Sequence, residues 1–153
     1  MSPRGHTRIS KLFVFTSVSG YAQVEADLRY DTTDPYAVTA LFHPVGADEV
    51  RWVFARDLLE QGLVRWAGEG DVRIGPDPDD PESTGVELIS PASRALLTVP
   101  TKQVVDFLDE TYRAVPPGAQ EEWLDLDSQL ERFLALSARS MKFRRRSSPS
   151  TTD

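Results

Sequence analysis

The stretch YAQVEADLRY, residues 21–30, alternates apolar and polar side chains without interruption. Successive side chains of a β-strand point to opposite faces of the sheet. A strict period of two therefore predicts a strand with one buried face and one solvated face. The predicted buried face consists of Ala22, Val24, Ala26, Leu28 and Tyr30.

Two similar strands are predicted immediately downstream. Residues 36–43 (YAVTALFH) and 50–55 (VRWVFA) also alternate, and the turn sequences DTTDP and HPVGADE precede them. Asp favours turns by bonding its own backbone, and Pro by fixing its φ angle. Strands joined in succession by short turns predict an antiparallel meander. The expected inward side chains are Val38, Ala40 and Phe42 on one strand and Val50, Trp52 and Phe54 on the next.

The hydrophobic period lengthens after Ala55, where Arg56 and Asp57 stand at a join between strand and helix. Leucines at helical spacing predict a short helix, with Asp57 as its N-cap and Gly62 closing it. Beyond it, strands are expected within 68–76, 85–90 and 95–100, with a turn-rich acidic loop at 77–83.

The chain is predicted to become helical after residue 100. Thr101 is the expected N-cap of a helix over 102–115, which Pro116, Pro117 and Gly118 end. A last helix is expected to start near Asp125 or Asp127. The predicted fold class is α+β, an antiparallel meander with a short helix after the third or fourth strand and C-terminal helices.

Length and composition predict a single globular domain, since the chain has 153 residues, of which 40% are apolar. The expected boundaries are a partly flexible N-terminal segment at 1–17, the domain at 18–137 and a disordered basic tail at 138–153. The longest apolar runs fall far short of the roughly 20 residues that a transmembrane helix needs. Without cysteines or a signal-peptide pattern, the expected location is the cytoplasm.

Charge is unevenly distributed along the chain. The net charge is −7, but residues 138–153 carry +4, so the remainder carries −11. An acidic body repels phosphate backbones, which makes nucleic acid an unfavourable partner.

No motif for catalysis, cofactor binding or metal binding is recognised. The glycines at 68 and 70 lack the third glycine of a dinucleotide fingerprint. Two histidines, His6 and His43, are too few for a zinc site in a chain without cysteine. The carboxylates between 77 and 82 lack the spacing and the glycine of a calcium loop. The sequence therefore predicts a non-enzymatic protein with no catalytic residues, metal or cofactor.

Four phrases occur in the order typical of the SsgA-like proteins, a family of small actinomycete proteins of sporulation and cell division. They are LRYD (28–31), DPY (34–36), FARDLL (54–59) and GDV (70–72). The chain resembles this family from about Tyr21 to Leu136. The N-terminal strand, the loop Pro76–Gly85 and the basic tail look particular to this chain.

The resemblance implies a function in septum placement. Family members are morphogenetic adaptors that recruit the tubulin-like division GTPase FtsZ, or that localise another SsgA-like protein that does so. It also implies a curved, whirly-like antiparallel sheet, assembly as a homotrimer and location at septum sites. Because whirly proteins bind single strands, a single-stranded nucleic-acid-binding module is the alternative, although fold does not carry function. An uncharacterised enzyme is the weakest option.

Five residues within the family-like phrases are candidate protein contacts. Arg56 is expected to be exposed beside a capping Asp57, because a strand-end cation there is not needed for folding, and Arg is common in binding hot spots. The other role open to the Arg56-Asp57 pair is a purely structural corner. The full candidate set is Asp34, Tyr36, Arg56, Asp57 and Asp71.

Overall fold

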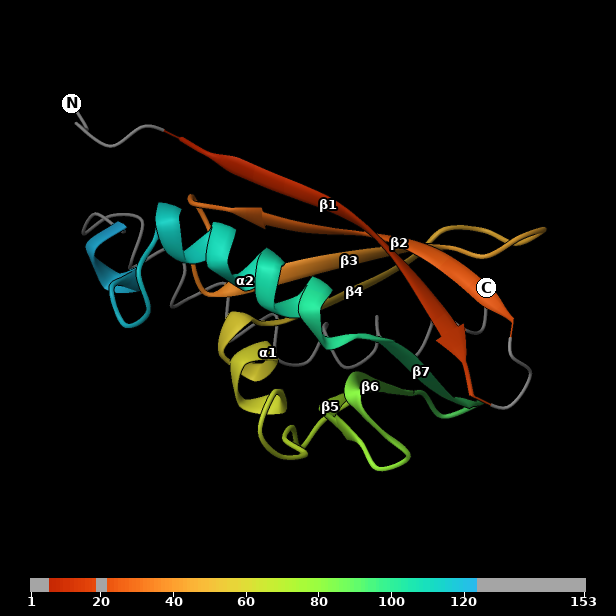
Figure 1. Cartoon of the computed structure of the whole chain (residues 1–153). Helices are drawn as coiled ribbons and strands as arrows, with labels where there is room; N and C mark the ends of the chain where they lie inside the picture. Colours follow the sequence, from red (N-terminus) through yellow and green to blue (C-terminus); the bar gives the residue numbers. More distant parts are fainter. Residues whose placement is uncertain (1–5, 19–21, 124–153) are drawn as a thin grey trace.

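A computed structural model of the chain describes residues 6–18 and 22–123. Seven strands form one antiparallel, curled sheet in the order β4-β3-β2-β1-β7-β6-β5 (Figure 1). The strands are β1 (Arg8–Ser17), β2 (Gln23–Asp31), β3 (Ala37–His43), β4 (Val50–Ala55), β5 (Val72–Asp77), β6 (Asp80–Ile89) and β7 (Arg94–Pro100). The helices are α1 (Arg56–Gly62), α2 (Thr101–Ala114) and the 3₁₀ helix η1 (Gln120–Trp123).

The predicted α+β fold is confirmed, including the meander and its facing. β2, β3 and β4 pair in register, with Tyr30 opposite Val38 and Val38 opposite Phe54. Trp52 is 2% exposed, as expected from its position between Val50 and Phe54. The local alternation of side chains therefore specified this half of the sheet.

The curled sheet forms a half-barrel, and helix α2 lies against its concave face (Figure 1). Phe107 is fully buried and packs edge-on against Phe13, with ring centroids 5.9 Å apart. On the same face, α1 packs on β5 so closely that a Cβ on Gly62 would overlap the side chain of Ile74. Gly62 ends α1 with no left-handed backbone angle, so its lack of a side chain serves packing.

Strand β1 requires a correction to the expected domain boundary at residue 18. Residues 8–17 lie inside the sheet, between β2 and β7. Phe13 and Phe15 are buried, while Leu12 and Val14 are 58% and 37% exposed. Because this strand is apolar on both faces, it lacks the alternation that marked the others.

The predicted helix caps are wrong. The N-cap of α1 is Ala55 and that of α2 is Pro100, and neither helix has a side-chain cap. Asp57 instead accepts a hydrogen bond from Gln120 at 3.4 Å. The hydroxyl of Thr101 bonds that of Thr84 at 2.8 Å. Tertiary partners therefore occupy both side chains that could have capped a helix.

The acidic segment 77–83 is shorter as a loop than predicted, because β5 continues to Asp77 and β6 begins at Asp80. Side chains of Asp77 and Asp80 accept backbone hydrogen bonds that tighten the turn. The helix expected near Asp125 and the basic tail lie outside the described residues. Within the described residues, no helix is long and apolar enough to span a bilayer.

Candidate functional site

Four of the five candidate residues meet at one end of the sheet. Asp34 and Tyr36 lie in the turn between β2 and β3, and Arg56 and Asp57 begin α1. The backbone amide of Arg56 donates to the carbonyl of Tyr36 at 2.7 Å, which holds the turn against the helix. Asp71 lies elsewhere, just before β5, where its carbonyl accepts from the amide of Ile89.

The expectation that Arg56 is exposed is wrong, because its side chain is fully buried. Nη1 donates to the carbonyl of Val115 at 2.7 Å and to that of Thr111 at 3.3 Å. These carbonyls belong to the C-terminal end of α2, where a cation is favoured by the helix dipole. Arg56 therefore joins α1 to α2 and is no surface contact.

Two tyrosine rings enclose the guanidinium of Arg56. Its central carbon lies 5.1 Å from the ring centre of Tyr30 and 4.9 Å from that of Tyr112, which is cation–π geometry. Burial raises the pKa of each tyrosine to about 12, although the charge of Arg56 opposes the shift. Both rings are therefore neutral at physiological pH, and Tyr30 also donates to the carbonyl of Pro35 at 2.7 Å.

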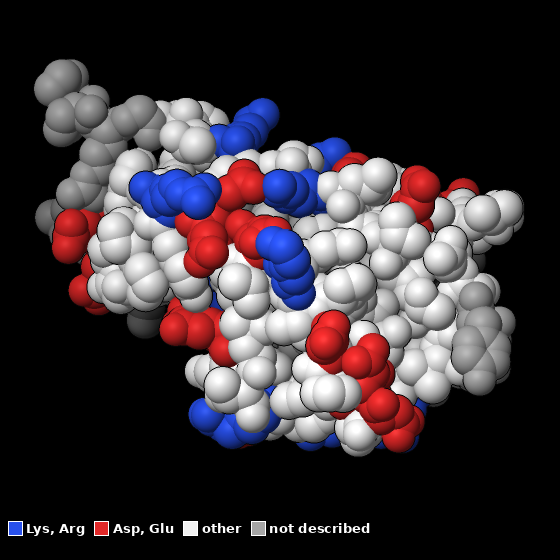
Figure 2. Space-filling view, viewed as in Figure 1, with Lys and Arg blue, Asp and Glu red and all other residues white. Residues whose placement is uncertain are grey.

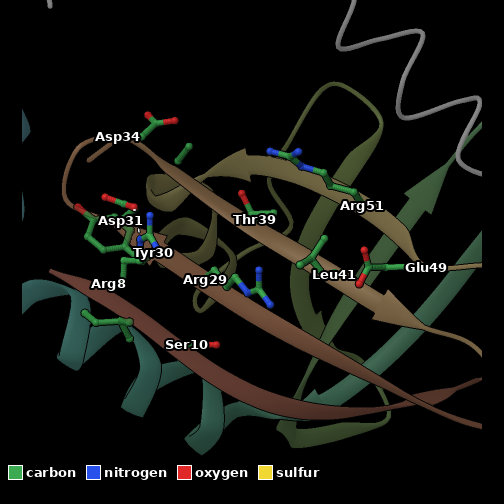
Figure 3. Close-up of a pocket in the computed structure, with 12 residues that line it drawn as sticks. Arg8, Ser10, Arg29, Tyr30, Asp31, Asp34, Thr39, Leu41, Glu49 and Arg51 are labelled. Atoms are coloured by element: carbon green, nitrogen blue, oxygen red, sulfur yellow. Dashed lines mark hydrogen bonds and ion pairs between the residues drawn. The ribbon is translucent and has the colours of Figure 1, made fainter.

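A groove of about 720 Å³ lies on the sheet face opposite α2, and we call it the outer groove (Figure 3). It crosses β1 to β4 and reaches the β2–β3 turn, so that of the five candidates only Asp34 lines it. It is lined mainly by outward-facing side chains of β1 to β4, both polar and apolar. The lining includes Arg8, Arg29, Asp31, Leu41, Glu49 and Arg51.

Hydrogen bonds stabilise the ionised form of Asp31 in the outer groove. It accepts from His6 at 2.7 Å and from Arg8 at 3.0 Å, and the amide and hydroxyl of Thr33 also donate to it. Partial burial opposes ionisation, but these hydrogen bonds outweigh it and lower the pKa of Asp31 to about 2. Asp31 is therefore ionised and already compensated by Arg8.

A second set of polar side chains in contact crosses the same sheet face. His43 lies 3.3 Å from Asp27 and 3.4 Å from Glu49. Arg29 reaches Asp27 only at 3.7 Å. No group of three or more potential metal ligands occurs within the described part of the chain. The arrangement suits recognition of a charged partner by side chains.

The groove arginines were missed by the candidate set. Arg29 and Arg51 occupy polar positions of predicted strands, so the alternation already assigned them to the solvated face. It could not show that neighbouring strands bring them to one groove.

Comparison with known proteins agrees with this architecture. A family model described as Streptomyces sporulation and cell division protein, SsgA, matches residues 24–121. The chain belongs to the SsgA family. The resemblance found in the sequence is thereby confirmed.

Relatives within the SsgA family carry the name sporulation-specific cell division protein SsgB. SsgB of Saccharopolyspora erythraea is 50% identical over 111 residues, which cover 72% of this chain and 79% of that protein. SsgB of Streptomyces coelicolor is 48% identical over 115 residues, covering 74% and 84%. This SsgA-family chain is therefore SsgB-like.

Solved structures of the SsgA family share the fold. An SsgA-like sporulation-specific cell division protein from Thermobifida fusca superposes with a TM-score of 0.73 at 34% identity, covering 87% of this chain and 99% of that one. A structure from work on SsgB mutations and longitudinal cell division in Streptomyces coelicolor gives a TM-score of 0.72 at 40% identity. It covers 80% of this chain and 100% of that one.

Proposed function

We propose that this chain is a non-enzymatic adaptor of sporulation-specific cell division. It helps to position or activate the septum through contacts with FtsZ or with another SsgA-like protein, in the cytoplasm at septum sites. The observation that carries the proposal is the family match over residues 24–121, together with relatives named as SsgB cell division proteins.

Exposed apolar side chains support protein contacts, including contacts between copies in a homotrimer. Leu12 on β1 is 58% exposed and Leu96 on β7 is 40% exposed, both on the outer sheet face. Apolar groups rimmed by polar ones are typical of protein-binding surfaces. Of the predicted contacts, Tyr36 is 37% exposed and Asp57 is exposed, so both stay in the proposal with Asp34 and Asp71.

The single-stranded nucleic-acid module receives less support. Figure 2 shows Lys and Arg interspersed with Asp and Glu on the face displayed, and no continuous basic track crosses that face. Nucleic-acid binders commonly present such a track to the phosphate backbone.

Localisation tests the proposal directly. A fluorescent fusion replaces the native gene in a sporulating actinomycete, with the fluorescent protein alone as control. The fusion is expected to gather at future septa before they close. A signal that stays as diffuse as the control contradicts the proposal.

Binding measurements separate the two function classes. Purified chain is titrated with FtsZ and with a single-stranded oligonucleotide, each at low and high salt. The adaptor proposal expects FtsZ, or a complex of FtsZ with a second SsgA-like protein, to bind. Tight DNA binding that falls steeply with salt would favour the alternative. Light scattering on the same sample tests the trimer, and a monomer at micromolar concentration contradicts it.

A further inference from the structure

Two arginines of the outer groove have no close counter-charge within the described part of the chain. Arg51 on β4 is exposed and forms no ion pair with any residue that the structure describes. Among the residues that the structure describes, the one ion pair of Arg29 on β2 is the long contact of 3.7 Å with Asp27. The third arginine, Arg8, is engaged by Asp31 at 3.0 Å. Arg29 and Arg51 are therefore the groove cations that a ligand can address.

The register of the strands places these two arginines on either side of β3. Arg29 lies opposite Thr39, and Arg51 lies opposite Leu41. Adjacent strands are spaced by about 4.8 Å, so β2 and β4 are roughly 10 Å apart. Figure 3 shows both arginines on the same sheet face, flanking Thr39 and Leu41. Between the charges, Leu41 forms an apolar floor that is 9% exposed.

This spacing suits an extended acidic chain. A guanidinium binds a carboxylate through two parallel hydrogen bonds. In an extended peptide, side chains two and four residues apart project on one side, and four residues span roughly 13 Å. Two carboxylates at that spacing can reach both arginines, and the apolar residue midway between them lies over Leu41.

We propose that the outer groove binds an extended acidic segment of a protein partner. One carboxylate pairs with Arg29, another pairs with Arg51, and an apolar side chain between them covers Leu41. The identity of the partner as a division protein rests on the proposed function, but the binding itself does not.

The rim of the groove favours a peptide over nucleic acid. Asp31, Asp34 and Glu49 also line it, and Asp31 is held ionised by its hydrogen bonds. An unbroken phosphate chain would approach these carboxylates. A peptide can place neutral residues beside them and acids only beside the arginines.

The test is a titration of the full chain with a fluorescent peptide made of two Glu-Ser-Leu-Ser-Glu units. A peptide with Gln in place of Glu measures the contribution of charge, and labelled oligo-dT measures binding of phosphate. Wild type is expected to bind the Glu peptide at least about tenfold more tightly than the Gln peptide. No preference for Glu, or tighter binding of oligo-dT that depends on the same arginines, would overturn the proposal.

Matched variants locate the site. The double variant Arg29→Gln/Arg51→Gln is compared with Arg65→Gln/Arg113→Gln, which removes two exposed arginines outside the groove. The groove variant is expected to lose about tenfold or more in affinity and the control less than about twofold. Equal losses would mean that only net charge matters, and the proposal would fail. Arg51→Gln alone serves if the double variant melts early, since Arg51 has no ion pair within the described chain to lose.

Failure of this proposal and failure of the adaptor function give different results. If the fusion stays diffuse while peptide binding depends on Arg29 and Arg51, the proposed adaptor function is contradicted and the proposed peptide site in the outer groove is supported. If the fusion gathers at septa while peptide binding does not depend on either arginine, the proposed peptide site is contradicted and the proposed adaptor function is supported.

Discussion

At the scale of single residues, the most informative side chain is Arg56. Its sequence position beside Asp57 pointed to a surface pair, yet its guanidinium is buried and bound to main-chain carbonyls of Thr111, Val115 and Pro116. Burial of a cation is tolerated when hydrogen bonds and aromatic faces replace its water. Here the end of α2 supplies the carbonyls, and Tyr30 and Tyr112 supply the faces.

Loss of Arg56 should therefore destabilise the fold. Arg56→Ala leaves buried carbonyls without a donor and opens a cavity, which should lower the free energy of unfolding by roughly 3–5 kcal/mol. Arg65→Ala, at an exposed position, should stay within about 0.5 kcal/mol. Urea unfolding of both variants measures the difference, and equal midpoints would show that the buried contacts contribute nothing.

The tyrosines beside Arg56 predict a loss of stability in alkali. The folded-state pKa of Tyr112 is raised from 10.0 to about 12, mainly by burial. A raised pKa stabilises the fold fully below pH 10, and the contribution disappears as pH rises through 12. Burial likewise raises the pKa of Tyr30 from 10.0 to about 12, so its contribution to stability is lost over the same pH range.

Tyr112→Phe should remove part of that pH dependence. The buried Tyr112 hydroxyl lies near Glu60, which helps to raise its pKa, but it makes no hydrogen bond of good geometry among the described residues, so Phe should fit at little cost below pH 10. Between pH 10 and 12 the variant should lose about 1–2 kcal/mol less than wild type, which is below the full value of the shift because the side chain is partly exposed and solvent screens it. Unfolding curves at both pH ranges check this, and parallel losses in the two proteins would contradict it.

At the scale of elements, close approach between segments decides several positions. α1 lies directly on β5 at Gly62, and the ring of Trp66 covers Gly75 and Gly85 on neighbouring strands. Helix propensity alone would favour Ala over Gly at position 62. The neighbouring strand reverses that preference because no space exists for a Cβ.

Gly62→Ala should therefore destabilise the protein, by about 1–3 kcal/mol, through overpacking against Ile74. Gly70→Ala is the matched control, since a Cβ there meets nothing within 4 Å and its backbone is not left-handed. The control should change stability by less than about 1 kcal/mol. Thermal melts measure the Tm of both variants and of wild type. An unchanged or raised Tm for Gly62→Ala would contradict overpacking against Ile74.

At the scale of the whole molecule, the sheet consists of two halves that meet at a short seam. β1 pairs with β2 over nearly its full length but with β7 only through Thr16 and Ser17. α2 contacts β1, β6 and β7, so it covers the seam from the concave side (Figure 1). Among the described residues, the outer face carries the outer groove and the exposed apolar side chains of Leu12 and Leu96.

The basic C-terminal residues are predicted to add little to folding. They lie outside the described part, and exposed polar segments rarely contribute much stability. Deleting residues 139–153 should leave the free energy of unfolding within about 0.5 kcal/mol. A drop of several kcal/mol would mean that this segment packs on the domain.

The sequence alone determined the meander β2–β4, helix α2 and the family. Strand and helix periods are local properties of ten or so residues, which the chain carries wherever those residues lie. The motifs that resemble the family, such as LRYD and FARDLL, are also contiguous segments, so they could be recognised without knowledge of the fold. The polar strand positions of Arg29 and Arg51 were visible in the same way.

Only the tertiary structure decided where β1 lies, that Arg56 is buried and that Arg29 and Arg51 share a groove. β1 carries apolar residues on both faces, so its place in the sheet depended on pairing with two other strands. The carbonyls that bind Arg56 lie 55 to 60 residues further along the chain. Hydrogen bonds and ion pairs form only between groups a few ångströms apart in space. A local sequence pattern therefore does not show which residues, distant along the chain, will form them.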